Sequence, residues 1–194
     1  MRNRKKGIYM INELVREVEY CLDHGCYMAA LATALILPDI CGKAKYPKME
    51  KHTKQRYIKW FDEYIGEYEK DPEDTTGMPY LSGELVYSLR CSILHQGNPN
   101  IEGKKQDIEY FELLYRKEEG ASVRVNCSEA RIVEANGKEI AVNKKYCVNV
   151  RMLCFKLCCV AMYFYKQHKE LFNFFNYKIV DCDFQTRRAF GIKD

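Results

Sequence analysis

The spacing of apolar residues predicts a mainly α-helical protein. Apolar side chains recur every three or four positions in residues 8–24, 51–68 and 149–172, which is the period of one face of a helix. Residues 26–37 are apolar on nearly every side, so we expect this segment to be the buried central helix of a bundle. Pro38 should end or kink that helix, because proline lacks the backbone N–H that a helix interior requires.

A further helix with well-marked ends is predicted within residues 81–99. Ser82 can cap its start by accepting a hydrogen bond from a free backbone N–H. Gly97 can adopt the left-handed conformation that ends a helix, and a proline two residues later prevents its continuation. The apolar face of this helix consists of Leu85, Val86, Leu89 and Ile93. Two polar residues, Arg90 and His95, stand out near its C-terminal end.

The periodicity changes after the proline at position 99. Residues 108–115 are aromatic and β-like, and two short apolar runs follow at 130–135 and 138–142. The Asn136-Gly137 pair between these runs favours a type I′ turn, which predicts a β-hairpin. We therefore interpret residues 106–146 as a small antiparallel sheet inserted into the helical bundle.

Composition describes a folded protein without secretory features. The chain has 194 residues, of which 47% are hydrophobic and 30% charged, and its net charge of +4 permits nucleic-acid binding without requiring it. No signal peptide is recognisable, so the ten cysteines are expected to be free thiols in a reducing cytoplasm. We expect that no apolar run reaches membrane-spanning length, because the best candidate, residues 148–165, contains Arg151 and Lys156.

Residues 43–59 are strongly basic and contain aromatic side chains. Basic residues beside aromatic rings suit RNA, because cations contact phosphates and rings stack on bases. The candidate RNA contacts are Lys51, Lys54, Arg56 and Lys59. In the alternative interpretation, Tyr57 and Trp60 belong to the core and the lysines only solvate a helix face. The acidic residues that follow, within 62–74, would repel phosphates and favour this alternative.

The cysteines do not predict a metal site. Cys154, Cys158 and Cys159 lack the paired Cys-x-x-Cys spacing of zinc ligands, and their neighbours are apolar, so we expect them to pack in the core. No glycine-rich phosphate loop, nucleophile elbow or His-Glu-x-x-His sequence is present. We therefore expect neither a metal nor another cofactor.

Residues 89–97 resemble a known family signature. The arrangement Arg90-x-x-x-x-His95, on a helix and followed by a glycine, resembles the Arg-(four to six residues)-His motif of HEPN domains. The resemblance implies a single HEPN-like helical domain over 1–194, forming a homodimer and associated with an antitoxin or a nucleotidyltransferase. It implies metal-independent endoribonuclease activity of a toxin–antitoxin or anti-phage defence type, with Arg90 and His95 as catalytic residues.

One position departs from the family pattern. Many catalytic HEPN motifs have Asn, Asp or another polar residue directly after the arginine, and this chain has Cys91. A non-catalytic HEPN-like module that binds RNA, a nucleotide or a protein partner therefore stays open as the alternative. A purely structural role also stays open, in which Arg90 is solvated and His95 binds the last carbonyls of its helix.

The chemistry of the motif residues suits RNA cleavage. Histidine transfers protons near neutral pH, and the guanidinium of arginine matches a phosphate. The helix dipole favours a protonated His95. Supporting roles are expected for Glu84, Ser88, Cys91, Ser92, Gln96 and Asn98. In a regular helix, at ~100° per residue, Arg90 and His95 would point about 140° apart, so one chain makes a site only if the last turn unwinds or a second copy contributes.

Overall fold

The computed structural model describes residues 10–70, 80–96, 108, 110–115, 127–135, 138–174 and 182–191. The α-helices are α1 (Met10–Asp23), α2 (Tyr27–Ala34), α3 (Leu37–Lys45), α4 (Thr53–Tyr64), α5 (Gly83–Cys91), α6 (Val150–Gln167) and α7 (Cys182–Ala189). Short 3-10 turns follow at η1 (Pro47–Met49), η2 (Gly66–Tyr68) and η4 (Lys169–Phe172), and η3 (Ser92–Gln96) is a π-helix. The strands are β1 (Tyr110–Leu114), β2 (Cys127–Ala135) and β3 (Lys138–Asn149). The prediction of a mainly helical protein is confirmed.

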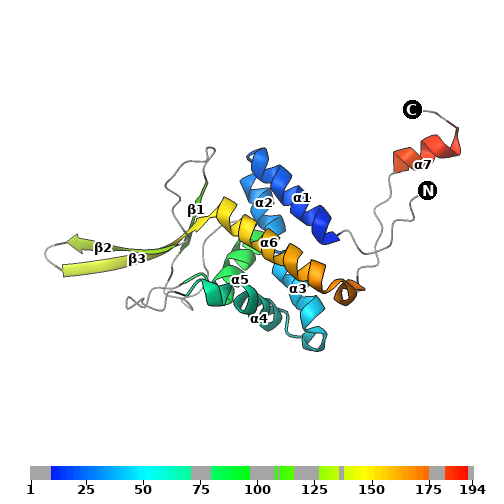
Figure 1. Ribbon diagram of the computed structural model, residues 1–194. Helices are drawn as coiled ribbons and strands as arrows, with labels where there is room; N and C mark the ends of the chain where they lie inside the picture. The colour runs from blue at the N-terminus through cyan, green and yellow to red at the C-terminus, as the bar shows by residue number, and fades with distance from the viewer. Residues whose placement is uncertain are drawn as a thin grey trace.

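Helix α6 crosses the middle of the helical bundle. It packs against α1, α2 and α3, while α4 lies between α3 and α5 (Figure 1). Asn149 caps the start of α6, because its side-chain oxygen accepts a hydrogen bond of 3.0 Å from the backbone N–H of Met152. The bundle thus forms from helices that are distant in sequence, and it holds α5, the predicted motif helix, against α4.

The predicted central helix is two helices. Leu31 and Leu35 are fully buried, as expected for this segment. The chain turns after Ala34, and α3 starts at Leu37 with Pro38 in its first turn. The expectation that Pro38 ends or kinks the helix agrees with this break, because proline has no N–H to bond to the carbonyl four residues earlier and is tolerated only in the first turn of the next helix.

The aromatic residues of α4 belong to the core. Tyr57, Trp60 and Phe61 are fully buried, and Trp60 stacks with Tyr64 while its ring meets Phe164 of α6 edge-on. The hydroxyl of Tyr57 donates a hydrogen bond of 3.1 Å to the Leu35 carbonyl. These rings are therefore not available for stacking with RNA bases, and the alternative interpretation of this segment is supported.

The sheet is mixed rather than antiparallel. Its strand order is β1-β3-β2: β2 pairs antiparallel with β3, and β1 pairs parallel with β3 along the opposite edge (Figure 1). The prediction of an antiparallel sheet was wrong for β1. The physical reason lies in β3, whose residues 146–148 are all buried, as is typical of a central strand with neighbours on both edges. Ala135 pairs with Lys138, as a two-residue turn requires, but Asn136-Gly137 itself lies outside the described residues.

One stretch within the described ranges is long and apolar enough to cross a membrane. It is Tyr27–Lys45, which covers α2 and α3, and half of its most apolar window is buried inside the bundle. The expectation that no stretch reaches this length was therefore wrong, and so was the choice of residues 148–165 as the best candidate. The apolar composition has a local cause, because core helices must be apolar on the sides that face their neighbours.

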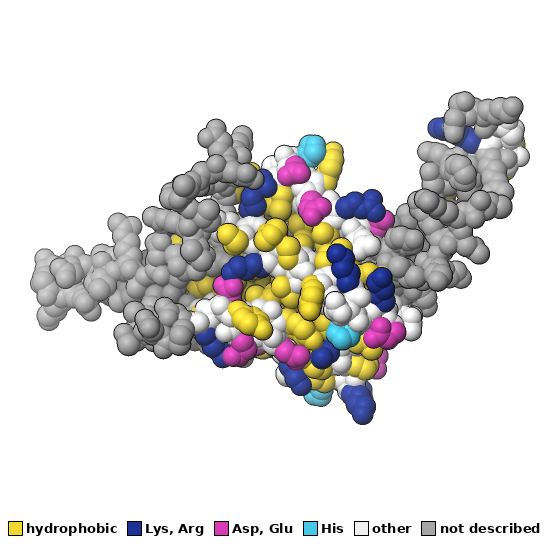
Figure 2. All heavy atoms as spheres, viewed as in Figure 1, with side chains coloured by type: hydrophobic (Ala, Val, Ile, Leu, Met, Phe, Trp, Pro, Cys, Tyr) yellow, Lys and Arg dark blue, Asp and Glu magenta, His cyan; other side chains and the backbone are white. Residues whose placement is uncertain are grey.

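An apolar stripe lies exposed along α6. Phe155 and Tyr163 are 63% and 64% exposed, and Cys159 lies exposed between them. Residues four apart lie on the same side of a helix, so the three side chains form one stripe. Figure 2 shows apolar side chains gathered over α6 on this face, among scattered lysines and arginines. The bundle therefore offers apolar surface to the surroundings on its α6 side.

Every cysteine whose side chain is described is a free thiol, and burial should determine its reactivity. We expect Cys26 and Cys182 to be alkylated first in the native protein, because they are exposed. Burial raises the pKa of Cys41, and a pKa higher by one unit leaves only about a tenth of the reactive thiolate. Cys41 and the buried Cys147 should therefore react at least about tenfold more slowly.

Mass spectrometry of alkylated peptides measures these rates. Alkylation in denaturant without a reducing agent is the control, and it should label all ten cysteines. Early native labelling of Cys41, or an intact disulfide in the denatured sample, would contradict the prediction.

Candidate functional site

The start of α5 is held by three polar contacts. Ser82 caps the helix as predicted, since its Oγ accepts a hydrogen bond of 3.3 Å from the Leu85 backbone N–H. The Asp62 carboxylate of α4 accepts a second one, of 2.6 Å, from the Gly83 N–H. Lys54 of α4 donates to Glu84 at 2.6 Å. The predicted apolar face of α5 is confirmed, because Leu85, Val86, Leu89 and Ile93 are all buried. The helix that carries the motif is thus fixed against α4.

Gly83 allows the backbones of α4 and α5 to come close together. A Cβ atom added at Gly83 would lie 2.6 Å from the backbone oxygen of Ile58, which is too near for any real contact. We expect Gly83→Ala to lower the free energy of unfolding by about 1–3 kcal/mol, as overpacking does, although alanine normally favours a helix. Urea unfolding measures the change. Ser88→Ala, at a partly exposed position of the same helix, is the control and should change stability by less than about 0.5 kcal/mol.

The helix does not stay regular to its end. After Cys91 the chain continues as the π-helix Ser92–Gln96, in which hydrogen bonds join residues five positions apart. Arg90 and His95 are five positions apart, so this local unwinding brings them to the same side. Arg90 Nη1 lies 3.2 Å from His95 Nε2. The last turn of the helix therefore unwinds, as a site within one chain requires. A second copy is not needed for the contact between Arg90 and His95.

Arg90 lies between three side chains. Its Nε and Nη2 each lie 2.9 Å from the Asp39 Oδ2, which comes from the first turn of α3. The guanidinium carbon lies 5.6 Å from the centre of the Tyr87 ring, within the range of a cation–π contact. With His95 on the remaining side, the guanidinium has a defined orientation, and both Arg90 and Asp39 have side chains only 17% exposed.

The contact between Arg90 and His95 determines which nitrogen of the imidazole carries a proton. A guanidinium has N–H donors and no acceptor, so Nε2 must accept the hydrogen bond. An accepting Nε2 carries no proton, so His95 is neutral in this arrangement, with its proton on Nδ1. This differs from the protonated His95 that the helix dipole favours, and Nε2 can act as a base when its contact with Arg90 opens.

Burial and charge act in opposite directions on the Asp39–Arg90 pair. Burial raises the pKa of the Asp39 carboxyl above its usual value, although Arg90 and Arg56 lower it in part. Burial lowers the pKa of Arg90, but Asp39 and hydrogen bonding to Cys91 raise it overall, so the guanidinium stays cationic. The site therefore keeps a fixed positive charge beside a neutral imidazole.

The residues expected to support the motif have varied surroundings. The hydroxyl of Ser88 donates to the Glu84 backbone carbonyl at 3.0 Å, and the Glu84 side chain binds Lys54. These contacts of Ser88 and Glu84 do not involve Arg90 or His95. The Cys91 thiol lies close enough to Arg90 and Tyr87 to raise the pKa of both, which places it at the edge of the site. Ser92 is buried. The Gln96 side chain and Asn98 lie outside the described residues.

The basic segment differs from the RNA-binding surface expected there. Arg56 is only 7% exposed, and the expectation that it contacts RNA from the surface was wrong, because its stem packs against α3 at Gly42. Lys54 is paired with Glu84. Lys51 and Lys59 are exposed, and the Lys59 ammonium lies 4.6 Å from the centre of the Tyr46 ring.

Asp39 is the residue of this site that sequence reasoning missed. It lies 51 positions before Arg90, in a segment whose sequence indicates a turn or one short further helical turn. The one local signal is an acidic residue directly after a proline, which is typical of the first turn of a helix. That signal predicts where α3 begins and says nothing about which side chain the carboxylate contacts.

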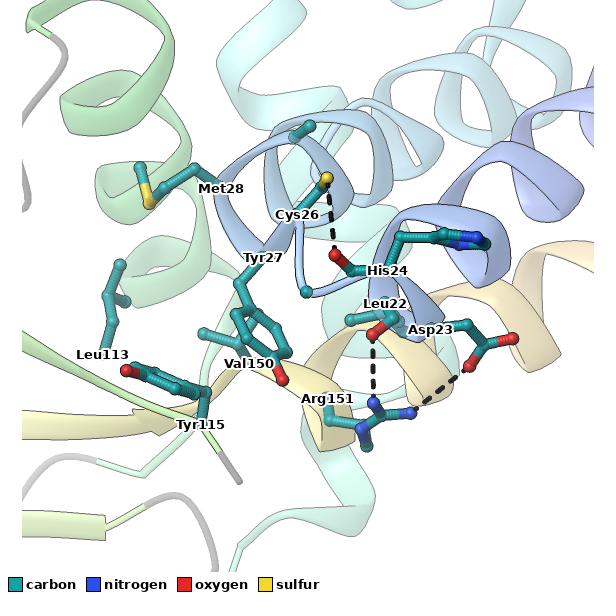
Figure 3. Close-up of a pocket in the computed structure, with 12 residues that line it drawn as sticks. Leu22, Asp23, His24, Cys26, Tyr27, Met28, Leu113, Tyr115, Val150 and Arg151 are labelled. Atoms are coloured by element: carbon teal, nitrogen blue, oxygen red, sulfur yellow. Dashed lines mark hydrogen bonds and ion pairs between the residues drawn. The ribbon is translucent and has the colours of Figure 1, made fainter. Parts of the chain in front are cut away.

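A separate hollow lies at the junction of α1 and α2. Its volume is about 930 Å³, and it is lined by Leu22–Ala29, by Leu113 and Tyr115 at the end of β1, and by Val150 and Arg151 at the start of α6 (Figure 3). The rings of Tyr27 and Tyr115 stack across it at 4.7 Å. None of the motif residues lines this hollow.

The polar groups of this hollow already have partners within the protein. Arg151 donates to the Leu22 carbonyl at 3.1 Å and lies 3.8 Å from Asp23 (Figure 3). His24 contacts the Tyr20 carbonyl at 2.8 Å through Nδ1 and stacks on the Tyr20 ring. The nearby Cys26 thiol contacts the His24 backbone carbonyl rather than its imidazole, so the two do not form a catalytic Cys–His pair.

The part of the chain described by the structure holds no group of three or more His, Cys, Asp or Glu side chains arranged for a metal ion. No protein-family model, curated protein or solved structure matches the chain. The functional argument therefore rests on the geometry of Arg90, His95 and Asp39.

Proposed function

We propose that this protein is a metal-independent endoribonuclease that acts in the cytoplasm, of the toxin–antitoxin or anti-phage defence type. The observation that supports it is the contact between Arg90 Nη1 and His95 Nε2 across a π-turn. It joins a cation suited to a phosphate and a nitrogen able to accept a proton, in the spacing that resembles the HEPN motif. The proposal needs no metal, because arginine supplies the charge that stabilises the transition state.

The proposed reaction uses the two residues in turn. A phosphodiester of RNA binds to Arg90 and takes the place of His95 on Nη1, and the freed His95 Nε2 takes the proton of the neighbouring 2′-hydroxyl and later returns it to water. The 2′-oxygen then attacks phosphorus, and the bond to the 5′-oxygen breaks. The leaving oxygen takes up a proton from water, so the products are a 2′,3′-cyclic phosphate and a 5′-hydroxyl. Arg90 balances the charge that develops on the phosphate oxygens.

The alternative function is a non-catalytic HEPN-like module that binds RNA, a nucleotide or a protein. Two observations favour it: Cys91 replaces the polar residue common in catalytic members, and the guanidinium of Arg90 already binds Asp39 and His95. A phosphate must therefore compete with, or add to, existing contacts. In this case Arg90 contributes binding energy and His95 transfers no proton.

The expected partners are a second copy of the chain and an antitoxin or nucleotidyltransferase. The exposed stripe of Phe155, Cys159 and Tyr163 on α6 supports a contact with a second copy, because large contiguous apolar patches often mark protein–protein interfaces. Sedimentation of the purified chain tests this part of the proposal, and a monomer at all concentrations would remove it.

The decisive experiment incubates the purified protein with a panel of RNAs in EDTA. We expect cleavage that leaves cyclic phosphate ends, and no cleavage of a matched substrate with 2′-deoxyribose at the cleaved position. If no RNA is cut but RNA, a nucleotide or a protein binds and Arg90→Ala weakens that binding, the module replaces the nuclease. Cleavage that requires a divalent metal would exclude the proposed mechanism.

A further inference from the structure

Asp39 directs its side chain to Arg90. Among the described residues its hydrogen bonds go to Arg90 alone: Nε and Nη2 both reach Oδ2 at 2.9 Å. The other oxygen, Oδ1, is buried and has no hydrogen-bond partner among the described residues. The carboxylate lies in the first turn of α3, a packed helix, so its position is fixed by the bundle.

Stability alone does not account for this pair. Taking two charged groups out of water has a large desolvation penalty, and apolar residues of similar size often serve stability as well or better. Here the penalty is increased by the carboxylate oxygen that is buried without a hydrogen bond. The pair has instead a clear geometric effect, since it holds one edge of the guanidinium.

The held edge determines where the rest of the guanidinium points. The guanidinium is planar, so fixing Nε and Nη2 also fixes the direction of Nη1. Nη1 is the atom that meets His95 Nε2, at 3.2 Å. A chain of contacts thus runs from α3 through Asp39 and Arg90 to His95 in the π-turn. The contacts between Asp39, Arg90 and His95 require a charged Asp39 carboxylate. Arg56, which is 7% exposed and lies nearby, favours that charged form.

We propose that Asp39 is a positioning residue, which orients the guanidinium of Arg90 against His95 and toward a bound phosphodiester. The effect on catalysis rests on the nuclease function proposed above. The effect on the imidazole does not, because Arg90 determines the tautomer of His95 in the protein without substrate. The two can therefore be tested separately.

Nitrogen-15 NMR of the imidazole provides the first test. Spectra are recorded about two pH units above the usual histidine pKa of about 6.5, and the His95 signals are assigned from the loss of signals in His95→Ala. Neutral His95 in the native chain should be the Nδ1–H tautomer, with Nε2 as acceptor. In Asp39→Asn the signals should shift toward the Nε2–H tautomer that free imidazole side chains favour, as they should in Arg90→Met, which removes the donor.

Two variants define the cause of the shift. Asp39→Glu keeps the charge and should keep more of the native tautomer than Asp39→Asn does. Asp23→Asn is the matched control, since it also removes a carboxylate beside an arginine, Arg151, but outside the motif. It should leave the His95 signals unchanged. An Nε2–H tautomer in the native chain, or a native tautomer in folded Asp39→Asn, would overturn the inference.

A measurement on the unchanged protein covers the case in which Asp39→Asn does not fold. The Nε–H of Arg90 donates to a partly buried carboxylate, so its exchange with solvent should be slower than that of the exposed Arg16. Equal exchange rates for the two would overturn the inference without any substitution at Asp39.

Kinetics then separate positioning from binding. Asp39→Asn retains the charge of Arg90, so KM should change little, while kcat should fall about 10- to 100-fold, because a misplacement of about 1 Å can cost on the order of 10²-fold. Unchanged kcat in a nuclease would overturn the positioning role and leave the function standing. If the chain cuts no RNA but the tautomer shifts as expected, the proposed function fails and the positioning of Arg90 by Asp39 stands.

Discussion

Replacing His95 with alanine should reduce EDTA-resistant RNA cleavage by about 10²–10⁴-fold, the usual contribution of a general base. The imidazole lies on the surface side of the π-turn and contacts Arg90 through Nε2, so its removal should leave the buried face of α5 intact. Rates are measured on a single RNA substrate under single-turnover conditions, together with thermal unfolding of the same sample. A loss of cleavage with an unchanged melting temperature supports the proposed role.

The matched control for this variant is His52→Ala. His52 is exposed before α4 and lies outside the site, so its substitution should leave cleavage within about twofold of the native rate. If His95→Ala changes neither cleavage nor binding but lowers stability, the residue serves only the end of its helix.

Two further substitutions define the chemistry of the pair. Arg90→Lys should also abolish cleavage, because lysine keeps the charge but cannot bind Asp39 and His95 at once through a planar fork. Cys91→Asn restores a residue common in the family, and it should raise activity or leave it unchanged. A large fall in Cys91→Asn would mean that the thiol beside Arg90 and Tyr87 is itself required.

The largest effect on stability is expected for Leu35→Ala. Leu35 is fully buried between α2 and α3, and its carbonyl accepts the hydrogen bond of Tyr57, so the site cannot collapse easily around a smaller side chain. Removing its two methyl groups and the carbon that carries them should lower the free energy of unfolding by about 2–5 kcal/mol. Urea unfolding gives this value from the shift of the midpoint at an unchanged slope.

Met28→Ala is the control for this measurement. Met28 lies in the adjoining helix but is 47% exposed, so its truncation should change stability by less than about 0.5 kcal/mol. A loss below 1 kcal/mol for Leu35→Ala would show that this part of the chain is peripheral to the core, against the burial seen at Leu31 and Leu35.

The sequence by itself determined the local features of the site. The period of the apolar residues predicts the helices, and the face of α5 that it identifies is buried as a unit. Ser82 caps α5 because the preference of serine for this position depends on nearby backbone groups alone. The pairing of Ala135 with Lys138 follows in the same way from the two residues between them. In each case the interacting groups are close in sequence.

The tertiary structure decided how distant residues meet. The four-residue spacing of Leu85, Leu89 and Ile93 suits a regular helix, so it did not reveal the π-turn that joins Arg90 to His95. Arg56 looked like a surface cation because it lies in a strongly basic segment, yet α3 covers it at Gly42.

The strand pairing and the partner of Arg90 have the same explanation. β1 pairs with β3 because the buried end of β3 needs a neighbour on both edges, which no local pattern in β1 expresses. Asp39 meets Arg90 across 51 positions because α3 and α5 both pack against α4. Short-range preferences therefore built the motif helix, and long-range packing placed the carboxylate that orients its arginine.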